Sequence, residues 1–163
     1  MSPRRPRPDP EVASSRVPPH RPEREDAGKR GRPCVHVHLW EPIYAVARLR
    51  GVPDPLPALD AGGAPASLLV GHGEVSLIAP ETVVDAVAGW VEEVARGWRA
   101  LTLEAVLPFS TVGLLAAAAR ALADVEVPVL VLSSHDTDHF LVPGEHLGRA
   151  LAVLHQAGLE KYL

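Results

Sequence analysis

Apolar residues between positions 34 and 157 follow two spacings, one typical of strands and one typical of helices. Short runs rich in valine, isoleucine and leucine predict strands at residues 43–49, 66–70, 74–78, 98–107, 127–132 and 140–142. Helical spacing predicts helices at residues 81–97, 114–123 and 145–157. Proline and glycine dominate residues 51–65, which predicts a loop with at most a short helix at 56–59.

The order of these elements contains one weak internal repeat of a βαββα unit. Such a repeat predicts an α+β fold in which antiparallel sheets carry helices packed on one face. We expect a first unit at residues 34–97 and a second at residues 98–163. Residues 1–33 are rich in proline and arginine and lack apolar periodicity, so we expect a disordered tail there.

Composition narrows the classes of protein to which the chain can belong. A net charge of −4 over 163 residues does not favour a nucleic-acid partner, and the apolar runs are too short to span a membrane. Cys34 is the single cysteine, so no disulfide can form within the chain. We therefore expect a cytoplasmic protein.

A dense polar cluster separates the last two predicted strands. Two carboxylates, hydroxyl groups and imidazoles occur together in residues 133–139. Asp and Ser favour turns for local backbone reasons, so one interpretation is simply a well-made turn. Polar loop residues on a rigid scaffold are often binding residues, and the cluster exceeds what a tight turn needs. The second interpretation is therefore a ligand site.

Metal binding is a further alternative. Alternation along an extended segment places Cys34, His36 and His38 on one face, where they can hold a soft divalent metal or form the polar face of an edge strand. A metal-dependent enzyme or metal-binding protein would draw its ligands from these histidines and the polar cluster, from His36, His38, His135, Asp136, Asp138 and His139.

Several segments resemble the ACT domain family, in particular small bacterial tandem-ACT proteins and the ACT pairs of cytosolic arginine sensors. The resemblance rests on residues 44–49, 74–81 and 97–101, on Gly113 with the alanine-rich helix after it, on Val127-Pro128 and on residues 133–143. It implies tandem ferredoxin-like units, no catalysis, no cofactor, and an amino acid or similar ligand bound at an ACT–ACT or dimer interface. It also implies a homodimer, and it places Asp138 on the relatives' ligand-contacting aspartate.

The residue chemistry is compatible with such a ligand. A helix that starts near Thr111 presents unpaired N–H groups to a carboxylate, Ser110 or Thr111 can cap it, and Gly113 allows close approach. Asp136 or Asp138 can accept hydrogen bonds from an ammonium group or a cationic side chain. The resulting ligand-site residues are Ser110, Thr111, Val112, Gly113, Leu114, Ser133, Ser134, Asp136, Thr137 and Asp138. A structural dimerisation module, in which the hairpin only satisfies its own turn, remains the third alternative.

Overall fold

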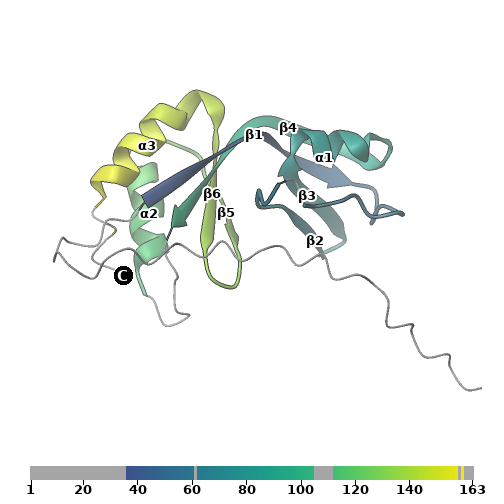
Figure 1. The fold of residues 1–163 in the computed structure, drawn as a ribbon, viewed down its shortest axis with the longest axis horizontal. Helices are drawn as coiled ribbons and strands as arrows, with labels where there is room; N and C mark the ends of the chain where they lie inside the picture. The colour runs from purple at the N-terminus through teal and green to yellow at the C-terminus, as the bar shows by residue number, and fades with distance from the viewer. Residues whose placement is uncertain (1–35, 61, 105–111, 158, 160–163) are drawn as a thin grey trace, which may run out of the picture.

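The computed structural model describes residues 36–60, 62–104, 112–157 and 159 and contains one six-stranded antiparallel sheet (Figure 1). The predicted α+β fold class with antiparallel pairing is confirmed. The elements in chain order are β1 (His36–Leu49), β2 (Ser67–Gly71), β3 (Glu74–Pro80), α1 (Glu81–Ala86), the 3-10 turn η1 (Ala88–Trp90), β4 (Val91–Glu104), α2 (Leu114–Ala123), β5 (Leu130–Ser133), β6 (Asp138–Pro143), the 3-10 turn η2 (Gly144–His146) and α3 (Leu147–Gln156).

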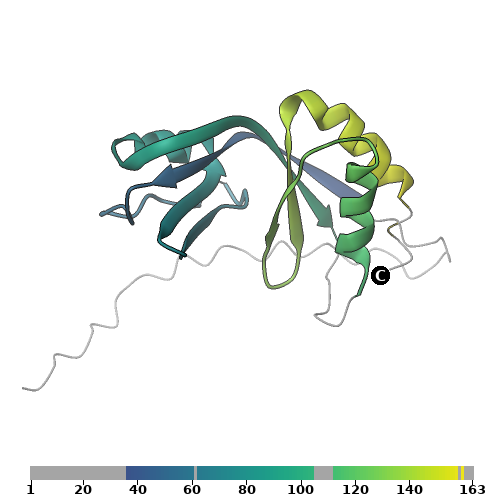
Figure 2. The ribbon, with the colours of Figure 1, turned by 180° about the vertical axis from the view of Figure 1, so that it is seen from behind.

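Two long central strands, β1 and β4, run through both halves of the molecule. The strand order is β2-β3-β1-β4-β6-β5. Residues 43–49 of β1 pair with β3 and with the first half of β4, whereas residues 36–39 pair with the second half of β4. We call β2, β3, α1 and the adjoining halves of β1 and β4 the first unit, and the remaining elements the second unit. Figures 1 and 2 show the two units from opposite sides, joined by these two strands.

The two units are related by an approximate two-fold axis that passes between β1 and β4. Tyr44 of β1 lies opposite Pro80 at the end of β3, and Trp98 of β4 lies opposite Pro143 at the end of β6. A helical segment follows each proline directly. Tyr44 and Trp98 are also partners of each other. The predicted division between residues 97 and 98 falls inside β4, at this axis, and it stays a prediction.

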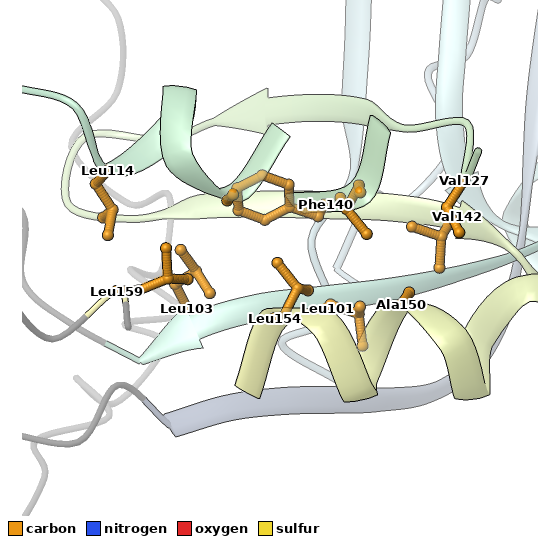
Figure 3. Close-up of a cluster of buried hydrophobic side chains, with 11 residues drawn as sticks. Leu101, Leu103, Leu114, Val127, Phe140, Val142, Ala150, Leu154 and Leu159 are labelled. Carbon is orange, nitrogen blue, oxygen red and sulfur yellow. The ribbon is translucent and has the colours of Figure 1, made fainter. Parts of the chain in front are cut away.

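The helices cover one face of the sheet because alternate strand residues turn toward them. In the second unit, Leu101 and Leu103 of β4 and Phe140 and Val142 of β6 pack with buried residues of α2 and α3, as Figure 3 shows. In the first unit, alternate residues of β1 and β3 pack against α1. The strand residues that alternate with these, including Tyr44, Ala100 and Leu141, form a third cluster on the other face of the sheet.

The prediction of one long helix over residues 81–97 is wrong. The helix α1 ends at Ala86, and β4 begins at Val91. Val91 and Val94 lie opposite Leu49 and Ala47 of β1, so pairing with a distant strand decides the conformation of this segment. Three- and four-residue spacing of valines is compatible with a helix, and local pattern does not reveal such a distant partner.

Other predicted boundaries also change. Residues 36–38 and 43–49 belong to the single strand β1. The strand β5 begins at Leu130, not at residue 127. Among the described residues of the loop that precedes β2, residues 56–59 form no helix.

Candidate functional site

The β5–β6 hairpin brings five of the predicted site residues together. Ser133 and Asp138 lie opposite each other where the strands end, and the Ser134 N–H donates to the Thr137 carbonyl at 2.9 Å to close the turn. The Ser134 hydroxyl also lies 3.0 Å from that carbonyl oxygen and 2.9 Å from the Thr137 hydroxyl. The hairpin therefore holds its polar side chains in a defined arrangement.

Asp138 faces the helix-covered side of the sheet. It is partly buried and lies two residues before Phe140, whose side chain packs with the helices. The Ser133 hydroxyl donates to Oδ1 of Asp138 at 2.6 Å, which is a short, charge-assisted hydrogen bond. This bond fixes the orientation of the carboxylate.

The second aspartate of the cluster has a different partner. Oδ1 of Asp136 lies 2.7 Å from Nδ1 of His135, and both side chains are largely exposed. The His135–Asp136 contact in the turn is thus separate from the Ser133–Asp138 pair at the strand ends. The two carboxylates occupy different positions in the hairpin, Asp136 in the turn and Asp138 at the start of β6.

The other predicted segment lies at the start of α2. Gly113 occupies the N-cap position with a φ of 98°, and among the described residues no side chain caps the helix. Ser110 and Thr111, which we expected to cap this helix, lie outside the described part of the chain, so that expectation stays a prediction. Leu114 is buried in the core, whereas Val112 is 85% exposed.

The hairpin turn and the start of α2 lie at the same end of the second unit. Figure 1 and the close-up in Figure 3, which view the protein from different directions, both show the turn near the first residues of α2, where Leu114 is labelled. No described side chain caps α2, and the first N–H groups of a helix can donate to an anion. A helix N-terminus and an oriented carboxylate at the same end together suit a zwitterion.

His139 belongs to the opposite face. Its Nδ1 lies 2.8 Å from the Thr102 hydroxyl, which also accepts a hydrogen bond of 2.7 Å from the Trp40 indole. Burial lowers the pKa of His139, and the nearby Asp138 carboxylate opposes this shift in part. Sequence reasoning missed this Trp40–Thr102–His139 chain, although alternation from Asp138 already predicts the opposite face for His139.

The described residues add no support for the hypothesis that the protein binds a metal ion. His36 and His38 are exposed at the edge of the second unit, and Cys34 lies outside the described residues. Within residues 36–60, 62–104, 112–157 and 159, no group of three or more His, Cys, Asp or Glu side chains is arranged to hold a metal ion. No helix in this part of the chain is long and apolar enough to cross a membrane.

Comparison with known proteins confirms the resemblance found in the sequence. The model of the ACT domain family matches residues 93–156, which include β6, α2 and the hairpin turn. No curated protein matches the chain in sequence. The matched segment begins in the first half of β4 and contains most of the second unit, in which the candidate site lies.

Solved structures share the fold of a larger part of the chain. A protein from Agobacterium tumefaciens is 24% identical, with a TM-score of 0.63 over 77% of this chain and 90% of that chain. A Vibrio cholerae protein of unknown function, described as a possible transport protein, is 24% identical, with a TM-score of 0.59 over 72% of this chain and 85% of that one. The ligand-free regulatory subunit of aspartate kinase from Thermus thermophilus is 19% identical, with a TM-score of 0.52 over 77% of this chain and 98% of that one. At these identities the likeness establishes the fold.

Proposed function

We propose that this protein is a non-catalytic regulatory protein that binds an amino acid or a similar small molecule at the end of the second unit. The observation that carries the proposal is the ACT domain match over residues 93–156, because it contains both the β5–β6 turn and the start of α2. In this proposal the protein acts in the cytoplasm as a homodimer and needs no cofactor.

The start of α2 and the Asp138 carboxylate suit the two charged groups of an amino acid. In this proposal the ligand carboxylate binds the first N–H groups of α2, where Gly113 has no side chain to obstruct it. The ligand ammonium binds the Asp138 carboxylate, which Ser133 holds in place. The hydroxyl groups of Ser134 and Thr137 bond to each other, so we give them the role of shaping the turn.

Exposed apolar residues beside this end support an interface there. Val112 is 85% exposed and Leu115 is 40% exposed, although both flank the buried Leu114. A ligand seated between them and the hairpin would remain open to water on one side. We propose that a second ACT unit, contributed by another copy of the chain, covers this side.

The test is a binding experiment with the purified protein against the twenty amino acids, followed by calorimetry for every ligand that raises the melting temperature. Asp138→Ala should weaken binding by about 10- to 100-fold, because it removes a charge-assisted hydrogen bond. Asp124→Ala is the matched control, since Asp124 pairs with Arg120 near the C-terminal end of α2. Wild-type affinity in Asp138→Ala would refute the proposed site.

A structural dimerisation module is the second candidate function. The observation that favours it is the hairpin itself, because Ser134 and Thr137 satisfy each other within the turn. This candidate predicts a dimer in solution, no thermal response to any amino acid, and an Asp138→Ala variant with unchanged properties. Both functions predict a dimer, so the thermal response to amino acids, and its loss in Asp138→Ala, separates them.

A further inference from the structure

We propose that Ser133 makes Asp138 selective for a compact ammonium group over a guanidinium group. This inference rests on the proposed function, because it concerns the cation that binds at the same site. It adds a chemical class to that function: the ligand carries a primary amine, and ligands whose cationic group is a guanidinium bind poorly.

The hydrogen bond from Ser133 occupies one side of the Asp138 carboxylate. Its length of 2.6 Å to Oδ1 lies within the range of strong bonds from a hydroxyl to a carboxylate. Among the described residues, Oδ2 of Asp138 accepts no hydrogen bond. Asp138 therefore offers a ligand one unoccupied oxygen and one that is already engaged.

The two cations need different acceptors. A guanidinium is a planar fork that binds a carboxylate most strongly through two parallel hydrogen bonds, one to each oxygen. An ammonium is a compact point charge that needs a single strong acceptor and can turn its remaining N–H groups elsewhere. The second bond of the fork must share Oδ1 with the Ser133 hydroxyl, which weakens that bond, whereas the ammonium needs only Oδ2.

The hairpin holds Asp138 and Ser133 in this arrangement. The bond from the Ser134 N–H to the Thr137 carbonyl closes the turn, and strand pairing sets Ser133 directly opposite Asp138. Asp136 does not supply the missing oxygen, because its carboxylate is engaged with His135 at the tip of the hairpin. The selectivity is therefore a property of the Ser133–Asp138 pair.

The experiment compares matched ligands that share a carboxylate and differ only in the cationic group. The probes are glycine with guanidinoacetate, β-alanine with 3-guanidinopropionate, and 4-aminobutyrate with 4-guanidinobutyrate, each titrated calorimetrically into the full chain. For the tightest pair we expect the amine to bind about tenfold or more tightly. Ser133→Ala should reduce this ratio by about fivefold to tenfold, because Oδ1 becomes free for the fork.

Two further variants make the result specific. Ser133→Thr retains the hydroxyl and should keep the wild-type ratio. Ser76→Ala removes a hydroxyl of β3, in the first unit, that bonds to Glu74, so it should leave the ratio unchanged. An unchanged ratio in Ser133→Ala, or a wild-type preference for the guanidino compounds, would overturn the inference.

The outcomes distinguish this inference from the proposed function. If amines and guanidino compounds bind wild type equally and Asp138→Ala abolishes both, the site stands and the selectivity is wrong. If Asp138→Ala binds every probe like wild type, or if neither the probes nor the twenty amino acids bind the wild-type protein, the proposed site falls and the selectivity falls with it.

Discussion

Tyr44 carries a buried hydroxyl group that has no hydrogen-bond partner among the described residues, and its removal should stabilise the protein. The side chain is 0% exposed and lies beside the axis that relates the two units, packed with Ala100 and Leu141. Within the described residues its hydroxyl makes no hydrogen bond. Tyr44→Phe keeps the ring and removes only this group.

The magnitude follows from the cost of an unpaired buried hydroxyl, which is about 1–3 kcal/mol. The variant loses a few dispersion contacts around the missing oxygen. We therefore expect Tyr44→Phe to raise the free energy of unfolding by about 1 kcal/mol, which corresponds to a melting temperature about 3–5 °C higher. Tyr44→Leu, which also removes the ring, should instead destabilise the protein through the cavity it leaves.

The pH dependence supplies a second readout. Burial raises the pKa of the Tyr44 hydroxyl above its ordinary value of 10.0. The unfolded chain therefore releases this proton at lower pH than the folded protein does. Ionisation of this group does not reduce the free energy of unfolding below pH 10, and it reduces it progressively as the pH rises above 10. The stabilisation by Tyr44→Phe relative to wild type should grow above pH 10 by up to about 1.4 kcal/mol per pH unit.

Urea unfolding of both proteins from pH 7 to pH 11, followed by circular dichroism, measures this difference. The reasoning would be refuted if Tyr44→Phe lost 1 kcal/mol or more at pH 7, an amount typical of a satisfied hydrogen bond. It would equally fail if the difference between the two proteins did not change above pH 10. Either result would mean that the hydroxyl has a partner in solution.

Four further predictions concern other parts of the fold. Partial burial lowers the pKa of His139 in the folded protein, so wild type should lose stability as the pH falls below 6.5 and His139→Gln should lose less in the same urea titration. Gly113→Ala should destabilise by about 1 kcal/mol or more because of its φ of 98°. Gly148 lies in α3 with open space around a new Cβ, so Gly148→Ala should stabilise by about 0.5–1 kcal/mol in thermal melts. A Gly113→Ala variant more stable than Gly148→Ala would contradict the geometry. A fragment of residues 98–163 lacks the strand formed by residues 36–39, so it should be unfolded by circular dichroism; a cooperative native-like melt would show that this strand is dispensable.

Elements whose signals are local could be predicted from the sequence. The alanine- and leucine-rich pattern of α2 predicts the helix within its observed bounds. Gly71-His72-Gly73 predicts the β2–β3 hairpin, because φ is positive at both His72 and Gly73. The polar run before Pro143 likewise locates the β5–β6 turn, since turn chemistry depends on neighbouring residues.

Features that depend on partners distant in the sequence could not be predicted. Val91 to Arg96 is a strand only because β1 lies beside it, and nothing in the local spacing shows this. The chain of hydrogen bonds from Trp40 through Thr102 to His139 joins three strands that are far apart in sequence. The bond between Ser133 and Asp138 lies between these cases, because the residue types are evident but their direct opposition requires the register of the hairpin.

The internal repeat provides a control for separating fold from function. The first unit has the same strand order as the second and the same proline at the end of its hairpin, yet Gly71 and Glu74 lie opposite each other at its turn, where the second unit has Ser133 and Asp138. In its described part, the connection from β1 to β2 forms no helix, whereas the corresponding connection of the second unit contains α2. The first unit therefore keeps a carboxylate at this position but has no serine opposite it and, in its described part, no helix start. Because the sheet forms without these two features, their occurrence together with Asp138 in the second unit is the physical reason to propose the ligand site there.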